Sequence, residues 1–373
     1  MLLRNLSVDD FIKYEKHCEK KIILFGTGVI ARVSAIYEFS KYDLGKYIMF
    51  AIDNDETKWG KNFEIAGEKI PVFAVEKLNE VRYRDDIIVL ITGSHFCGML
   101  QQIEQMNLQK AECFVLPVMY VSHLQEKSVG AVRETDDAVI PKKIHYMWFG
   151  KKEMPPVLKR CIQSWKIMCP DYEIICWNEN NYDLDRHPYM RQAYEHKQWG
   201  FIPDYARLDI LYQFGGIYMD TDVELIKSLD DMLYQEAFTS VEKWNVINIG
   251  GCTGCVSHHS GIKKILDERK NVFFETEGKL NKTASGYYDT MPFIREGLQL
   301  DGTNQKIAGV NIYASDYFHP YDYMSGKTAI TKNTYSIHHF NGGWLDERVV
   351  LQREIMKRTY QEIVENKSKS GVT

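Results

Sequence analysis

The segment Phe201–Leu225 constrains the fold most, because it orders a helix, a glycine pair, a short strand and two acids. From residue 204 to residue 214 apolar residues recur at helical spacing, and Pro203 stands in the first turn, where a helix tolerates proline. Gly215-Gly216 should end this helix, since glycine accepts the left-handed conformation of a helix C-terminus. The apolar run Ile217–Met219 then predicts a short buried strand.

Two aspartates, Asp220 and Asp222, follow this strand with one threonine between them. On an extended chain residues i and i+2 point the same way, so both carboxylates should lie on one side, close enough to share a cation. Carboxylate oxygens are hard ligands that suit Mg²⁺ or Mn²⁺ bound to phosphates. An Asp-x-Asp pair is also frequent in turns, so the metal interpretation depends on the rest of the chain.

Length, charge and cysteine content set the class of the protein. A chain of 373 residues exceeds the ~250–300 at which single cores usually divide, which predicts two domains. The net charge of −5 argues against a nucleic-acid partner, because such proteins normally carry a basic patch. The eight cysteines show no even disulfide framework, which indicates a reducing compartment. No secretory signal and no run of ~20 apolar residues is present, so we expect a cytoplasmic protein.

Residues 1–128 have the pattern of a nucleotide-binding α/β domain. A strand over residues 21–25 leads into Gly26-Thr-Gly28 and a helix, and a second strand ends at Asp53. Later apolar strands alternate with helices, which predicts a parallel, doubly wound sheet. Two interpretations of the glycines stay open. They hold a nucleotide cofactor together with Asp53, or they only allow a tight turn.

The second domain is predicted to cover residues 139–373. It follows a polar stretch of mixed charge, residues 125–138, which we interpret as a linker. The domain begins with a predicted strand over residues 142–149, and Trp148 lies near its carboxyl end, the edge where open α/β sheets bind ligands. An aromatic ring there is suited to stack on a nucleobase, and a core tryptophan is the alternative.

Asp204 and Arg207 lie three residues apart in the first turn of the helix that precedes the two aspartates. One interpretation is structural, because the helix dipole favours an acid there and the arginine pairs with it. The other interpretation is that the pair lines a sugar pocket beside Asp220 and Asp222. The residues by themselves leave both open.

Five sequence blocks occur in a fixed order over residues 139–345: IPKKIHYMWFG, the Ser-Trp pair of 164–165, PDYEIICWNEN, DYARL with GGIYMDTDVEL, and NTYSIHHFNGGW. Together they resemble the glycosyltransferases with a DXD sugar-binding region. That family includes bacterial capsular polysaccharide transferases, yeast-type mannosyltransferases and, more distantly, glucosylating bacterial toxins. Residues 20–117, with FGTG and AIDNDETKWG, resemble the small Rossmann-like domains that precede sugar-modifying enzymes in bacterial polysaccharide pathways.

The resemblance implies a GT-A fold in the second domain, a mostly parallel nucleotide-binding sheet with helices on both faces. It implies that Trp148 stacks on the nucleotide base and that Asp204 and Arg207 contact the donor sugar. Asp220 would contact the sugar and the ribose. Asp222 would ligate the divalent cation, Mn²⁺ or Mg²⁺, on the donor diphosphate.

The resemblance also implies that a C-terminal residue near Trp344 completes the metal or phosphate site, and it places Trp344 at the donor. His338 or His339 fills that place here. Strand alternation lets only one of the two histidines face the site, and we favour His338. Pro203 departs from the serine that is common before the aspartate, so the family's local contact is not carried over to it.

We therefore expect a metal-dependent, retaining glycosyltransferase, with Asp204, Arg207 and Asp220 as candidate catalytic residues. It would move a hexose from a UDP- or GDP-sugar to a glycan or lipid-linked glycan, in capsule or surface polysaccharide synthesis. Two alternatives stay open. One is an NAD-dependent nucleotide-sugar oxidoreductase or epimerase that uses Gly26 and Gly28, and the other is a non-catalytic sugar-nucleotide binding module.

The C-terminal segment, residues 346–366, is predicted to form a closing helix with several arginines and lysines. One interpretation is a peripheral contact with the anionic inner face of a membrane, where lipid-linked acceptors reside. The other interpretation is an ordinary solvated helix face.

Overall fold

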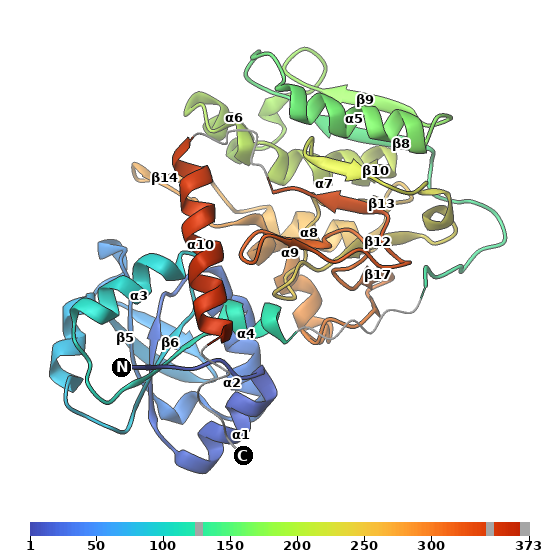
Figure 1. The fold of residues 1–373 in the computed structure, drawn as a ribbon. Helices are drawn as coiled ribbons and strands as arrows, with labels where there is room; N and C mark the ends of the chain where they lie inside the picture. The colour runs from blue at the N-terminus through green and yellow to red at the C-terminus, as the bar shows by residue number, and fades with distance from the viewer. Residues whose placement is uncertain (124–129, 341–346, 366–373) are drawn as a thin grey trace. The chain divides into compact units, whose positions relative to one another are not determined.

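The computed structural model describes residues 1–123, 130–340 and 347–365. The chain divides into two compact units. The first comprises Met1–Gln125, Met324–Gly326 and Glu347–Thr373, and the second comprises Glu126–Tyr323 and Lys327–Asp346. Each unit has its own large sheet of mostly parallel strands together with helices, so the prediction of a two-domain α/β fold is confirmed (Figure 1).

The first unit contains a seven-stranded sheet in the order β1-β7-β6-β2-β3-β5-β4. Its strands are β1 (Leu2–Leu3), β2 (Lys21–Phe25), β3 (Ile48–Ile52), β4 (Asn62–Ile65), β5 (Glu68–Phe73), β6 (Ile87–Ile91) and β7 (Glu112–Val115). All pairs are parallel except β4 with β5. Every residue of β6 is buried, as expected for a parallel strand that is covered on both faces.

The helices of the first unit are α1 (Val8–Cys18), α2 (Ile36–Tyr42), α3 (Phe96–Gln105), α4 (Leu116–Ser122) and α10 (Glu347–Glu365). The helix α10 contacts α3 and α4, and it belongs to this unit although the sequence places it in the second domain. Its buried face explains the grouping, because Tyr360 and Ile363 are 7% and 1% exposed. None of the described helices combines the length and the apolar character of a membrane span.

The second unit contains a seven-stranded sheet in the order β16-β17-β12-β13-β10-β8-β9. Its strands are β8 (Lys143–Met147), β9 (Glu173–Trp177), β10 (Gly216–Tyr218), β12 (Ala237–Ser240), β13 (Thr253–Cys255), β16 (Gln305–Ile307) and β17 (Val310–Tyr313). The strands β8, β9, β10, β12 and β17 run in one direction, and β13 and β16 run against them. The carboxyl ends of β8, β10 and β12 therefore lie at one edge.

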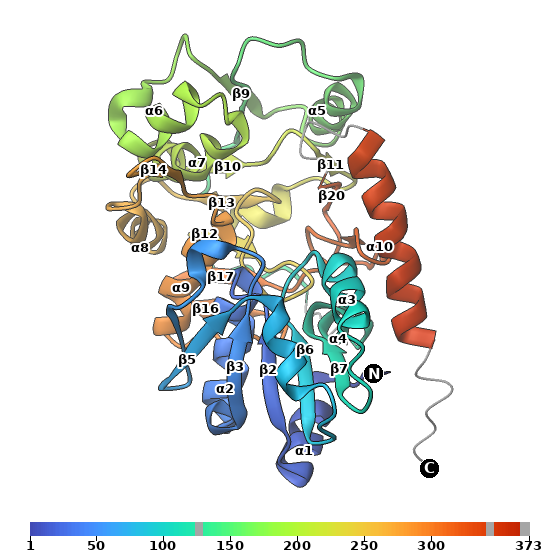
Figure 2. The same ribbon diagram turned by 90° about the vertical axis from the view of Figure 1, so that its left-hand side faces the viewer.

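Among the described residues, this unit also contains five α-helices, short 3-10 helices and three two-stranded sheets. The helices are α5 (Pro156–Met168), α6 (Pro188–Glu195), α7 (Pro203–Phe214), α8 (Ser260–Arg269) and α9 (Ser285–Arg295). The small sheets pair β11 (Val223–Leu225) with β20 (Ser336–His338), β14 (Glu275–Thr276) with β15 (Lys279–Leu280), and β18 (Tyr321–Asp322) with β19 (Lys327–Thr328). Figure 2 shows β11 and β20 side by side.

The join between α7 and β10 depends on its two glycines. Gly215 and Gly216 have φ values of +63° and +93°, which L-residues rarely adopt. A Cβ atom on Gly216 would also lie 2.9 Å from the ring of His145 and from the carbonyl oxygen of Lys143. The glycine pair therefore allows α7 to end directly against the sheet and to lead into β10, as the sequence predicts.

Candidate active site

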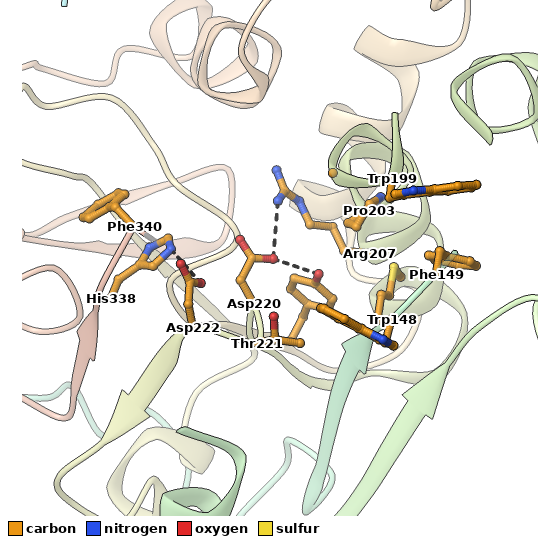
Figure 3. Close-up of a pocket in the computed structure, with 13 residues that line it drawn as sticks. Trp148, Phe149, Trp199, Pro203, Arg207, Asp220, Thr221, Asp222, His338 and Phe340 are labelled. Atoms are coloured by element: carbon orange, nitrogen blue, oxygen red, sulfur yellow. Dashed lines mark hydrogen bonds and ion pairs between the residues drawn. The ribbon is translucent and has the colours of Figure 1, made fainter. Parts of the chain in front are cut away.

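A pocket of about 290 Å³ opens at the carboxyl ends of β8 and β10 (Figure 3). Its walls come from the end of β8, the short helix η6 (Trp199–Phe201), α7, the turn after β10 and the end of β20. The lining residues are Met147, Trp148, Phe149, Trp199, Gly200, Pro203, Arg207, Tyr218, Asp220, Thr221, Asp222, His338 and Phe340. This edge of the sheet is where open α/β folds bind ligands.

Asp220 and Asp222 belong to a tight turn that joins β10 to β11. The N–H of Val223 donates to the carbonyl of Asp220 over 3.1 Å, and the N–H of Asp220 donates to the carbonyl of Gly250 over 2.8 Å. The chain is bent here rather than extended, which differs from the expected geometry. The two carboxylates still line the same pocket, because the turn brings them together.

The Ser-Trp pair on α5 fixes the strand that follows this turn. The indole Nε1 of Trp165, which is fully buried, donates to the carbonyl of Val223 over 2.7 Å, and the hydroxyl of Ser164 accepts the N–H of Leu225 over 2.9 Å. On its other side β11 pairs with β20, with Val223 opposite His338. This pairing explains how a histidine far downstream reaches the pocket.

His338 lies beside both aspartates. One ligand atom from each of Asp220, Asp222 and His338 can be chosen so that all three atoms lie within 4.8 Å of one another. The Nε2 atom of His338 is 3.3 Å from a carboxylate oxygen of Asp222, and its Nδ1 atom is buried without a hydrogen-bond partner among the described residues. Burial disfavours the charged imidazole, but the carboxylates of Asp222 and Asp220 outweigh it and raise the pKa of His338.

His339 points elsewhere. Its backbone N–H donates to the carbonyl of Asp222 over 3.1 Å, while its ring Nε2 lies 2.9 Å from the carboxylate of Glu224. The structure therefore brings His338, and not the ring of His339, next to the two aspartates. Trp344 lies outside the described residues.

Arg207 lines the pocket, and Asp204 lies against it in the first turn of α7. Both are buried, at 4% and 7% exposure. The guanidinium of Arg207 is 3.4 Å from Asp204 and 4.0 Å from Asp220, and its Nε atom has no partner among the described residues. Burial raises the pKa of Asp204 to about 6, and the nearby arginines oppose that shift only in part.

Two tryptophans line the pocket near its β8 side, and the sequence predicts only one of them. Trp148 follows β8, and its Nε1 donates to the carbonyl of Lys152 over 2.7 Å. Trp199 precedes α7 and packs closely on Gly150, where a Cβ atom would lie 2.8 Å from the indole ring. Gly150 has a φ of +89°, so the close approach and the backbone both require glycine. A tryptophan directly before the helix that carries Asp204 was the available signal for Trp199.

Tyr218 also lines the pocket, and the sequence did not predict its place there. Its hydroxyl donates to a carboxylate oxygen of Asp220 over 2.8 Å, and so orients that carboxylate. Tyr218 and Asp220 are two residues apart at the end of β10, and this spacing was the available signal.

The predicted cofactor residues of the first unit form a loop that the protein itself closes. Gly26 directly follows β2 with a φ of +100°. The carboxylate of Asp53 accepts the N–H and the hydroxyl of Thr27 over 2.7 and 2.6 Å, and the Lys58 ammonium over 2.9 Å. Burial opposes ionisation of Asp53, but these hydrogen bonds outweigh it and lower its pKa. Gly28, by contrast, has open space where a Cβ atom would lie.

Comparison with known proteins identifies the region around this pocket. Residues 155–239 match the model of a family described as "Glycosyltransferase sugar-binding region containing DXD motif", and they include α5, α7 and the turn with Asp220 and Asp222. The chain carries a glycosyltransferase DXD region. The predicted family is thus confirmed, and the comparisons support a transferase.

Relatives of this glycosyltransferase region include two curated proteins of Schizosaccharomyces pombe (strain 972 / ATCC 24843). Inositol phosphoceramide mannosyltransferase 2 is 28% identical over 163 residues, which cover 42% of this chain and 43% of the relative. Inositol phosphoceramide mannosyltransferase 3 is 30% identical over 111 residues, 29% of this chain and 31% of the relative. The chain thus spans less than half the length of each. Among solved structures, the PaToxG glycosyltransferase aligns with a TM-score of 0.34 and 18% identity over 42% of this chain and 70% of its own.

Proposed function

We propose that the protein is a metal-dependent, retaining glycosyltransferase that moves a hexose from a nucleotide-diphosphate sugar to a glycan acceptor. The observation that carries this proposal is the convergence of Asp220, Asp222 and Arg207, which belong to the DXD region, and of His338, which lies outside it, on one pocket. These residues come from three separate parts of the chain. A purely structural pairing of Asp204 with Arg207 does not account for the acids and the imidazole that face them.

The donor set fits a divalent cation held by Asp220, Asp222 and His338. Asp204, Asp220 and Asp222 carry three negative charges when ionised, and Arg207 supplies one positive charge, which leaves two for a cation to offset. Two carboxylates with one imidazole lie between the oxygen-only sites typical of Mg²⁺ and the imidazole sites of softer metals, and this favours Mn²⁺. When bound, the cation would stabilise the negative charge that develops on the departing diphosphate.

Side chains around the pocket bind the donor and stabilise the charge that develops on the sugar. Trp148 offers an aromatic face to the nucleobase. The buried Nε–H of Arg207 offers a hydrogen bond to an oxygen of the donor, because no described residue accepts it. The carboxylate of Asp220, oriented by Tyr218, stabilises positive charge at the anomeric carbon, and Asp204 contributes from behind Arg207. We infer that departure and attack occur on the same sugar face, so the configuration is retained.

The acceptor and the location extend the proposal. The names of the two yeast relatives combine mannose transfer with a phosphoceramide acceptor, which supports testing lipid-linked glycans beside soluble ones. The capsule or surface polysaccharide pathway and a cytoplasmic position at the inner membrane face stay predictions. The exposed apolar side chains of α10, Val350, Leu351 and Ile355, are the feature that supports a peripheral membrane contact.

A donor panel tests the proposed function. UDP- and GDP-hexoses are incubated with the protein and Mn²⁺, and sugar release is measured with and without a chelator. We expect release from one nucleotide class and its loss on chelation. Absence of both hydrolysis and binding for every donor would contradict the proposal and favour a chain without transferase activity.

A further inference from the structure

Behind Arg207 the second unit contains a buried chain of ion pairs that extends away from the pocket. Asp289 on α9 lies 3.3 Å from the guanidinium of Arg207 and 2.7 Å from that of Arg269 on α8. The three side chains are almost completely buried, at 0% exposure for Asp289, 2% for Arg269 and 4% for Arg207. Of these three side chains, only Arg207 lines the pocket.

The two oxygens of the Asp289 carboxylate are divided between the two arginines. Oδ1 accepts from Arg269 and Oδ2 from Arg207. A buried guanidinium without a partner is costly, so Asp289 fixes where both arginines rest. The Nη2 atom of Arg207 thereby lies near both Asp289 and Asp204, while its Nη1 atom is 4.0 Å from Asp220.

Arg269, at the end of this series of ion pairs, is held in place by further contacts. Its guanidinium donates to the backbone carbonyl of Ser285 over 3.1 Å and lies 4.9 Å from the centre of the Tyr288 ring. Both partners belong to α9, the helix that carries Asp289. Arg269 is therefore fixed by the helix it supports, and it leaves Asp289 little freedom to move.

The helix α9 is itself fixed to the segment that shapes the Asp220 turn. The hydroxyl of Thr290 accepts the N–H of Ile247 over 2.9 Å, and three residues further along Gly250 accepts the N–H of Asp220. A Cβ atom on Gly250 would collide with the Asp220 carboxylate. Asp289 and Asp220 are thus positioned at different nitrogens of the Arg207 guanidinium by connected parts of the second unit.

We propose that Asp289 is a positioning residue for sugar transfer, which acts by holding the Arg207 guanidinium in its orientation toward the donor. This inference rests on the proposed function. Arg269 is the anchor that keeps Asp289 in place. In this arrangement Asp289 does not touch the donor, and its whole effect on turnover passes through Arg207.

A double-mutant cycle tests this proposal. Asp289→Asn keeps the size of the side chain but removes the charge that holds Arg207, and we expect kcat/KM for donor hydrolysis to fall about 10- to 100-fold, the usual cost of a small misplacement. Arg207→Met should cost at least as much. In the Arg207→Met background, Asp289→Asn should change neither hydrolysis nor donor affinity, which is measured by calorimetry so that low turnover does not hide the result.

The surface pair of Arg295 with Glu268 provides the matched control, because it also joins α8 to α9 but does not contact Arg207. Arg295→Gln should leave the kinetics unchanged. Equal losses from Asp289→Asn in both backgrounds would overturn the positioning role while the transferase activity stands. Absence of binding and turnover in the wild type would overturn the proposed function and this inference with it. If Asp289→Asn does not fold, Arg269→Lys takes its place in the same cycle.

Discussion

Asp53 in the first unit and Asp220 in the second unit follow strands at comparable places in their sheets, but the protein surrounds them differently. Asp53 comes directly after β3 and closes the glycine loop. Its carboxylate accepts hydrogen bonds from Thr27, Lys58 and the N–H of Asp55, all between 2.6 and 2.9 Å. Its side chain is 10% exposed. Protein donors therefore occupy both of its oxygens.

The Asp220 carboxylate accepts a hydrogen bond from Tyr218, has Arg207 at 4.0 Å and is 31% exposed. It faces a pocket that also contains buried nitrogens of Arg207 and His338 for which the described residues supply no hydrogen-bond partner. An acid at a strand end is available to a ligand only where protein donors leave its oxygens unoccupied. In the second unit the Asp220 carboxylate is available to a ligand of the proposed site, and in the first unit the Asp53 carboxylate holds its own loop.

This comparison also bears on the oxidoreductase alternative. A ribose would have to displace Thr27 and Lys58 from Asp53 before it could bind there. Tyr37 and Lys41 have the Tyr-x-x-x-Lys spacing of a proton relay, and the Lys41 ammonium lies 5.5 Å from the centre of the Tyr37 ring. Tyr37 comes nine residues after Gly28, however, which corresponds to roughly 13 Å along a helix.

The largest effect is expected from removing the charge of Asp222 in the pocket of the second unit. Asp222→Asn should lower Mn²⁺-dependent donor hydrolysis by about 10²- to 10³-fold, comparable to the loss of one transition-state donor, because the cation loses a charged ligand. Asp53→Asn makes the same change at the glycine loop of the first unit, Gly26–Gly28. It is the matched control and should leave donor hydrolysis unaffected. Near-normal turnover of Asp222→Asn at saturating Mn²⁺ would contradict the assignment of the site.

The sequence predicted the elements around the open site because their signals are local. Helical spacing, the glycine pair and the apolar run specify α7, Gly215-Gly216 and β10 without reference to the rest of the fold. Trp148 followed from its place at a strand end. Short-range patterns of this kind depend only on neighbouring residues.

The remaining parts of the site depend on long-range pairing that no local pattern contains. The register of β11 with β20 brings His338 to Asp222. Without that pairing the sequence could only favour His338 over His339, because strand alternation says that one of them faces the site but not which one. Asp289 has the local pattern of a helix-start acid, yet its partners are arginines of two other helices. The grouping of α10 with the first unit is likewise a matter of tertiary packing.

The second prediction concerns pH. Burial raises the pKa of Asp204 from its ordinary value near 4 to about 6, so the folded state holds the proton more tightly than the unfolded state, and stability decreases as pH rises from about 4 to about 6. Above pH 6 the free energy of unfolding is lower by on the order of 3 kcal/mol. Asp204→Asn removes this dependence, so the variant should gain stability relative to the wild type as pH rises. Urea unfolding in chelator at pH 4 and pH 7 measures it, and a constant difference would contradict it.

The third prediction concerns Asp53, whose ionisation should make the stability of the fold increase with pH. The lowered pKa of Asp53 means that its ionised form stabilises the fold, with the benefit complete above the unfolded pKa and lost as pH falls through the folded value. Asp53→Asn should cost about 2 kcal/mol at pH 7, since the Thr27 and Lys58 donors lose a charged acceptor. Calorimetry should show a melting temperature lower by roughly 5 °C. The deficit should shrink on acidification, and a deficit that is equal at all pH values would assign it to packing rather than charge.

The smallest effect distinguishes two tryptophans that have the same local hydrogen bond. The Nε1 of Trp148 donates to the carbonyl of Lys152, and that of Trp59 donates to the carbonyl of Asp53, each over 2.7 Å. Stacking on a base is worth ~1–3 kcal/mol, so Trp148→Leu should weaken nucleotide binding about 10-fold. Trp59→Leu removes the same kind of bond beside the closed loop and should leave that affinity unchanged. Calorimetric titration with UDP and GDP measures both variants. If Trp59→Leu weakened nucleotide binding and Trp148→Leu did not, the base would bind in the first unit. The ligand site would then lie beside Asp53 and not beside Asp220.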